Sequence, residues 1–85
     1  MADYTHKFVE DYQGLVGFGL DRETDESSLV CYLQMFSNDE LMAVLKKRFS
    51  DDDIEEILDL VSRQLRKHLT EEEYHTLFLG DAQHQ

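Results

Sequence analysis

The second half of the chain carries a regular pattern of apolar and polar positions. Apolar side chains recur at steps of three and four residues, at Ile54, Ile57, Leu58, Val61, Leu65 and Leu69. This spacing places them on one face of an α-helix, and Asp59, Arg63 and Arg66 fall on the opposite face. The pattern predicts a long amphipathic helix whose apolar stripe faces a core.

Three helix starts are predicted from one repeated arrangement of residues. Ser or Thr is followed three residues later by an acid, as in a capping box, and apolar residues flank the motif so that they can contact each other. The three sets are Phe36-Ser37-Glu40-Leu41, Phe49-Ser50-Asp53-Ile54 and Leu69-Thr70-Glu73-Tyr74. They predict helices near residues 38–48, 51–68 and 71–79, and Gly80 is the predicted stop of the last one.

The first half of the chain is predicted to hold two further helices. One begins near Asp3 and carries Tyr4, Phe8, Tyr12, Leu15 and Val16. The other spans about residues 25–36, with Thr24 or Asp25 as its N-cap and an inward face made of Leu29, Tyr32, Leu33 and Phe36. The glycine-rich segment 13–20 between them is either a frayed helix end or an apolar loop, because glycine destabilises a helix interior.

The predicted fold is therefore all-α, a compact bundle of four to five short helices joined by tight turns. The chain has 85 residues, which is the size of one domain. We expect a single helical domain over residues 1–80 and a mobile C-terminal tail over 81–85.

Charge and composition exclude several classes of partner. The net charge is −11, from 19 acidic and 8 basic residues, so the chain as a whole should repel nucleic acid and anionic membranes. No apolar run reaches the roughly 18 residues of a membrane span, and the start of the chain lacks the pattern of a signal peptide. The lone cysteine, Cys31, cannot form an internal disulfide and is expected to be a buried thiol. These features indicate the cytoplasm.

The candidate chemical motifs are weak. Glu72 and His75 share a helix face at the spacing used in di-iron bundles, but such a site needs a second motif and more carboxylates. The glycines of Gly14-x-x-Gly17-x-Gly19 follow no strand and contain no Lys, unlike a phosphate loop. The sequence thus predicts no catalytic residue, no metal site and no cofactor.

The function that we expect is a non-enzymatic, acidic protein–protein interaction module, for example a regulator or an adaptor. Two alternatives are a small metal-binding or enzymatic protein that uses Glu72 and His75, and an acidic inhibitor that mimics nucleic acid. The candidate interface consists of apolar residues in excess of a small core, namely Leu15, Val16, Phe18, Leu20 and Leu60.

Leu60 lies about 120° from the centre of the long helix's apolar stripe, taking 100° per residue. The first helix can cover Leu60 in a closed monomer. Alternatively, the apolar residues form an exposed patch, which a symmetric homodimer most commonly closes. The excess of apolar residues favours the exposed patch and the homodimer.

Overall fold

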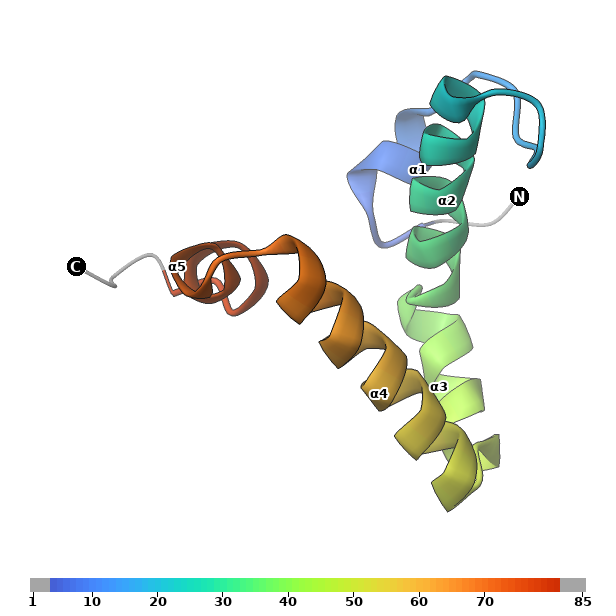
Figure 1. Cartoon of the computed structure of the whole chain (residues 1–85). Coiled ribbons are helices and arrows are strands. Elements are labelled where there is room, and N and C mark those ends of the chain that lie inside the picture. Colours follow the sequence, from blue (N-terminus) through green and yellow to red (C-terminus); the bar gives the residue numbers. More distant parts are fainter. Residues whose placement is uncertain (1–3, 82–85) are drawn as a thin grey trace. The chain divides into compact units, whose positions relative to one another are not determined.

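The computed structural model describes residues 4–81, and all regular structure within them is helical (Figure 1). The elements are α1 (Lys7–Asp11), α2 (Arg22–Phe36), α3 (Asp39–Arg48), α4 (Asp51–His68), α5 (Glu71–Glu73) and a π-helical turn, η1 (Tyr74–Phe78). The predicted all-α fold of short helices joined by tight turns is confirmed. The chain divides into two compact units, Met1–Arg48 and Phe49–Gln85.

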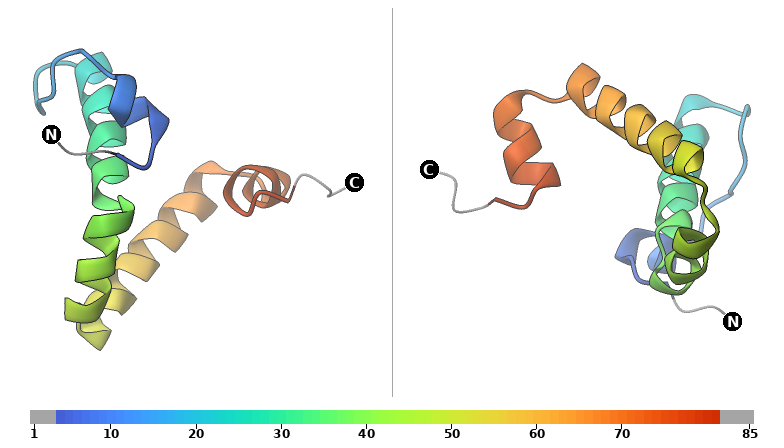
Figure 2. Two further views of the ribbon diagram at one scale, coloured as in Figure 1. Left: turned by 180° about the vertical axis from the view of Figure 1, so that it is seen from behind. Right: turned by 90° about the horizontal axis from the view of Figure 1, so that it is seen from below.

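The first unit is built around α2, and α1 lies beside α2 in the views from the front and from behind (Figures 1 and 2). Ser28 and Cys31 of α2 are the fully buried side chains of the described residues, which agrees with the buried thiol predicted for Cys31. The backbone N–H of Val9 in α1 donates to Oε1 of Gln34 in α2 at 3.0 Å. Gln34 of α2 therefore faces the short helix α1, and Ser28 accepts from Gly17 of the loop that follows α1.

The predicted first helix from Asp3 to Val16 is wrong in extent. Asp3 lies outside the described residues, α1 begins at Lys7, and the backbone is already extended at Tyr12. The Tyr12 ring occupies the space in which a Cβ at Gly14 would lie. The N–H of Gly17 donates to Oγ of Ser28 at 2.8 Å rather than to a helical carbonyl. Residues 13–20 therefore form a loop, and the frayed-helix alternative is discarded.

The N-cap predicted for α2 is also wrong, because Asp21 caps the helix instead of Thr24 or Asp25. The Asp21 carboxylate accepts hydrogen bonds from the N–H of Thr24 at 2.8 Å and from its hydroxyl at 3.0 Å. These two bonds, the backbone one first, hold the pKa of Asp21 below its ordinary value. Asp25 instead accepts from the N–H of Gly19 at 2.8 Å, and Gly19 adopts a positive φ of 86° in the turn before α2.

The start of α3 departs from the predicted capping box at Ser37. Ser37 ends α2, and its Oγ lies 2.9 Å from Nε2 of His6. The hydroxyl of Thr5 accepts from the N–H of Asp39 at 3.1 Å, and Oδ1 of Asn38 accepts from the N–H of Thr5 at 2.7 Å. A segment 34 residues earlier in the chain therefore supplies the acceptor that we expected from Ser37.

Two predicted capping boxes are confirmed in the second unit, one at the start of α4 and one at the start of α5. Oγ of Ser50 accepts from the N–H of Asp53 at 3.1 Å, and the Asp53 carboxylate accepts from the N–H of Ser50 at 3.0 Å. Thr70 and Glu73 repeat the arrangement at 3.1 and 2.9 Å. Each box satisfies two backbone donors that a helix start leaves without intrahelical partners.

The last helix differs from a simple α-helix. It starts at Glu71 and becomes π-helical at Tyr74, so that the N–H of Leu79 donates to the carbonyl of Tyr74, five residues earlier, at 3.1 Å. Gly80 follows with a φ of 68°, which confirms the predicted stop. Of the predicted tail 81–85, residues 82–85 lie outside the described residues.

Candidate interaction surface

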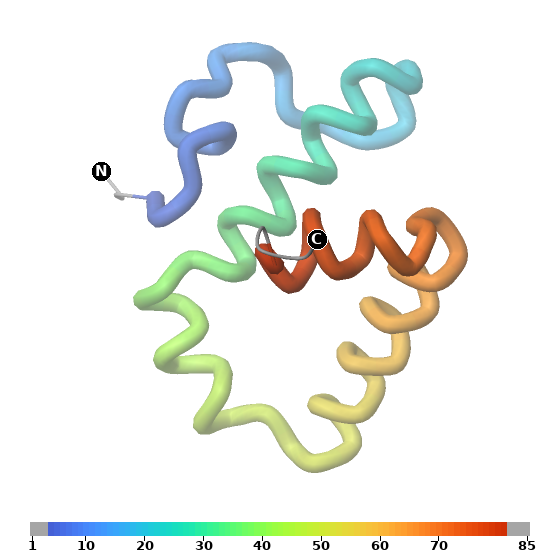
Figure 3. The backbone as a smooth tube through the Cα atoms, turned by 90° about the vertical axis from the view of Figure 1, so that its left-hand side faces the viewer, coloured from blue at the N-terminus to red at the C-terminus, as the bar shows by residue number. Residues whose placement is uncertain are grey.

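An open apolar groove lies within the second unit, between α4 and the segment formed by α5 and η1. The chain turns sharply at Leu69 and Thr70, and the tube drawing follows this turn from α4 into the last helix (Figure 3). The groove has a volume of about 550 Å³. It is lined by Leu58, Val61, Ser62, Leu65, Arg66, Leu69, Thr70, Glu71, Tyr74 and Phe78.

The α4 wall of the groove is the apolar stripe recognised in the sequence. The stripe forms on one helix face as predicted, but the second unit does not cover it. Ile54 remains 50% exposed, Leu58 60% and Val61 39%. An aliphatic side chain left half in water forgoes about half of the 1.5–3 kcal/mol that full burial provides. The stripe is therefore a surface that another surface would cover favourably.

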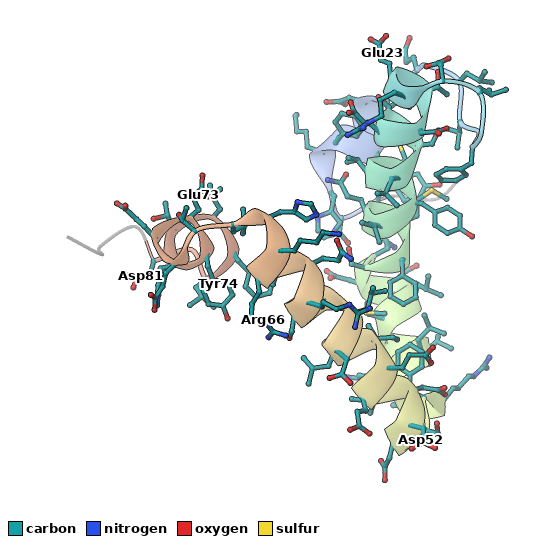
Figure 4. All side chains as sticks on the ribbon, viewed as in Figure 1. Glu23, Asp52, Arg66, Glu73, Tyr74 and Asp81 are labelled. Carbon is teal, nitrogen blue, oxygen red and sulfur yellow. The ribbon has the colours of Figure 1, made fainter. Side chains whose placement is uncertain are left out.

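Aromatic side chains form the opposite wall. The rings of Tyr74 and Phe78 stack with centroids 5.4 Å apart and planes inclined by 19°. The π-helical turn places these residues, four apart in the sequence, on the same side. Arg66 and Tyr74 lie on the same side of the turn between α4 and α5 (Figure 4). The groove thus has an aliphatic wall, an aromatic wall and a guanidinium group at its edge.

The charges of α4 are separated along its length. Its first turn holds Asp51, Asp52 and Asp53, and its last turn holds Arg66, Lys67 and His68. This order stabilises the helix through its dipole. The two ion pairs given by the described residues, Lys7–Asp11 and Arg22–Glu26, both lie in the first unit. The carboxylates and cations of α4 form no ion pair within residues 4–81 and face solvent.

The candidate interface residues of the first unit are exposed. Leu15, Val16, Phe18 and Leu20 lie in the loop between α1 and α2, and each is more than half exposed. The loop is held in place, because Gly17 and Gly19 donate to α2 side chains and the Tyr12 hydroxyl donates to the carbonyl of Leu15 at 2.9 Å. Phe18 also contacts Tyr32 of α2 edge-to-face, with centroids 5.8 Å apart.

Leu60, the fifth candidate interface residue, lies on α4 in the second unit and is about half exposed. It stands off the apolar stripe, as its position in the sequence indicates. The described structure therefore presents an exposed apolar loop in the first unit and the half-exposed Leu60 in the second.

The inward face predicted for α2 is wrong within the first unit. Its residues, Leu29, Tyr32, Leu33 and Phe36, are exposed, while Ser28 and Cys31 occupy the buried face. The loop donates to Ser28 through Gly17 and α1 donates to Gln34 through Val9, so the chain before α2 contacts the face with small and polar side chains and not the large apolar ones.

Within residues 4–81, no metal-ligand cluster forms around Glu72 and His75. Glu72 lies in α5, and His75 lies in η1 beside the Tyr74 ring. In the described part of the chain, His, Cys, Asp and Glu side chains nowhere gather in a group of three or more that can hold a metal ion.

The sequence pattern did not reveal the groove residues Arg66, Tyr74 and Phe78 as a binding surface. The pattern places Arg66 on the polar face of the long helix and gives Tyr74 only as an apolar residue that flanks a helix start. The spacing of Tyr74 and Phe78 was a signal that they share a face. That this face borders an open groove depends on the angle at the turn between Leu69 and Thr70.

Comparisons with known proteins give no match: no family model fits the chain, and no curated protein or solved structure is significantly similar to it. Over residues 4–81, each helix is too short or too polar to cross a membrane.

Proposed function

We propose that the chain is a non-enzymatic protein–protein interaction module, a regulator or adaptor, whose binding surface is the groove between α4 and α5. The carrying observation is the apolar stripe of a well-capped helix that stays about half exposed at Ile54 and Leu58. Contiguous exposed apolar surface on a soluble protein is typical of an interaction site. The lone thiol, Cys31, supports a reducing compartment such as the cytoplasm.

The groove suits a helix of a partner. Grooves lined by apolar residues bind the apolar face of an amphipathic helix, with anchors at three- and four-residue steps. Aromatic residues and arginine supply most of the binding energy at such interfaces, and Tyr74, Phe78 and Arg66 all line this groove. The capping boxes at Ser50 and Thr70 keep the two helix starts in place without a partner.

Site-specific photo-cross-linking in the native cell tests this function. A photoreactive phenylalanine analogue replaces Leu58, which faces the groove, and a matched control replaces Glu56, on the opposite side of α4. We expect irradiation to join the Leu58 variant to a protein chain and to leave the Glu56 variant largely unjoined. A cross-link that forms only within the same chain would show a closed monomer and contradict the proposal.

A further inference from the structure

We infer that the occupant of the α4 face is a second copy of this chain, bound so that the two α4 helices run antiparallel about a two-fold axis. This inference rests on the proposed function, because it names the partner of the same surface. Three features of α4 support it. The apolar stripe is exposed, the charges are ordered along the helix, and both the stripe and the charges are complementary to those of a second α4 that runs in the opposite direction.

The charge order requires an antiparallel arrangement. Acidic side chains occupy the first half of α4, and Arg63, Arg66 and Lys67 occupy the second half. Two parallel copies would place the acidic halves side by side, and like charges at that distance repel. Antiparallel copies place each acidic half beside the basic half of the other copy. Charge pairing of this kind fixes register and orientation between helices.

The register follows from helix geometry. The stripe from Ile54 to Leu65 is centred near residue 60, so a two-fold axis there aligns the stripe with itself. At about 100° per residue, Glu55 and Arg66 lie on one flank of the stripe, while Asp53 and Lys67 lie on the other. In an antiparallel pair related by a two-fold axis, each flank of the stripe lies beside the same flank of the other copy. Glu55 is therefore opposite Arg66 of the second copy, and Asp53 is opposite Lys67.

The other helices of the chain are less complementary to α4 in length and charge than a second α4 is. α3 has 10 residues and is about 15 Å long, whereas α4 has 18 residues and is about 27 Å long. α2 has 15 residues, but no basic residue stands in its last turn to face the acidic start of α4. Among the described helices, α4 alone has the length, the apolar stripe and both charges that a full-length match requires.

The contact is isologous, so each charge pair occurs twice in the dimer. Glu55→Arg creates two Arg–Arg oppositions, and Arg66→Glu creates two Glu–Glu oppositions. Each variant should dissociate about 10- to 30-fold more readily than the unchanged chain, because exposed pairs at two sites turn from attractive to repulsive. Mixing the two variants restores both attractive pairs, since every Arg then faces a Glu.

Sedimentation equilibrium on the full chain measures these effects. We expect the unchanged chain to dimerise, each single variant to be weakened, and the equimolar mixture to recover dimers that contain one copy of each. Glu56→Arg is the matched control, because it makes the same charge change on the outer side of α4 and should leave the dimer intact. Circular dichroism checks that every variant keeps its helices.

Three results would overturn the inference: an unchanged chain that is monomeric, single variants that dimerise as well as the control, or a mixture that recovers nothing. A monomeric chain whose Leu58 probe still cross-links to another protein would remove the homodimer and leave the proposed function intact. A monomeric chain whose Leu58 probe cross-links only within its own chain would contradict both the homodimer and the proposed function.

Discussion

Ser28→Ala should destabilise the first unit more than its small change in volume suggests. Ser28 has no exposed surface, and its Oγ accepts the 2.8 Å hydrogen bond from the N–H of Gly17. This bond is the polar contact between α2 and the part of the loop that carries Leu15, Val16 and Phe18. Removing the acceptor leaves a half-buried backbone donor without its partner.

The magnitude follows from two opposing effects. A donor that loses its partner inside a protein costs about 1–3 kcal/mol. Alanine favours the helix interior over serine by roughly 0.5 kcal/mol, which offsets part of that cost. The expected net loss in free energy of unfolding is about 0.5–2.5 kcal/mol. Ser27→Ala is the matched control, because Ser27 is the neighbouring α2 residue and its side chain makes no hydrogen bond within residues 4–81.

Urea denaturation followed by circular dichroism compares the two variants, and amide hydrogen exchange at Gly17 reports on the bond directly. We expect Ser27→Ala to be neutral or slightly stabilising and Ser28→Ala to be destabilising with faster exchange at Gly17. Equal stabilities together with unchanged exchange would refute the role assigned to this hydrogen bond.

Three further outcomes are expected. Ser50→Ala should cost about 1 kcal/mol in urea denaturation, because α4 loses its N-cap acceptor, whereas Lys46→Ala should cost far less; equal losses would contradict this helix start. Because folding lowers the pKa of Asp21, the contribution of this carboxylate to the free energy of unfolding is complete at a pH above its ordinary pKa of 3.8. The contribution is lost as the pH falls through the folded-state pKa. Asp21→Asn should therefore lose less stability on acidification than the unchanged chain does, and parallel pH profiles of the melting temperature would count against this. A strong chelator should leave the melting temperature unchanged, and a large drop would revive a metal site at Glu72 and His75.

The features that the sequence predicted correctly are local ones. The capping boxes at Ser50 and Thr70 each involve residues three apart, so the pattern contains every group that forms them. Gly80 likewise ends its helix through its own backbone conformation. Interactions that close within one helical turn leave little room for alternatives.

The features that the sequence missed depend on distant contacts. Thr5 supplies an acceptor to Asp39 across 34 residues, so no local pattern contains the pair. Ser37 has the spacing of a capping residue, but its Oγ lies 2.9 Å from Nε2 of His6, and Thr5 accepts from the N–H of Asp39 instead. The backbone is extended at Tyr12, after the first helix ends at Asp11, and farther along the N–H of Gly17 donates to the distant Ser28 instead of to a helical carbonyl.

The sequence predicts one part of the candidate surface, the apolar stripe of α4, but not the open groove beside it. The apolar stripe of α4 was identified residue by residue, yet periodicity describes only which side chains share a face. Whether Leu58 is covered depends on the angle at which α5 leaves α4, and that angle keeps the groove open. Leu33 of α2 also has helical spacing but is exposed, because the buried face of α2 within the first unit is the one that carries Ser28 and Cys31.

Distance measurement between spin labels tests the central claim, an antiparallel pair of α4 helices, most directly. One label per chain is attached to a cysteine at Asp52 or at Asp59, both on the outer side of α4, in a Cys31→Ser background. At 1.5 Å per residue about an axis near residue 60, the axial separation between copies is about 24 Å for position 52 and about 3 Å for position 59. We therefore expect a clearly longer distance for the Asp52 label than for the Asp59 label. Equal distances, which a parallel pair would give, or the absence of any intermolecular distance would contradict the account.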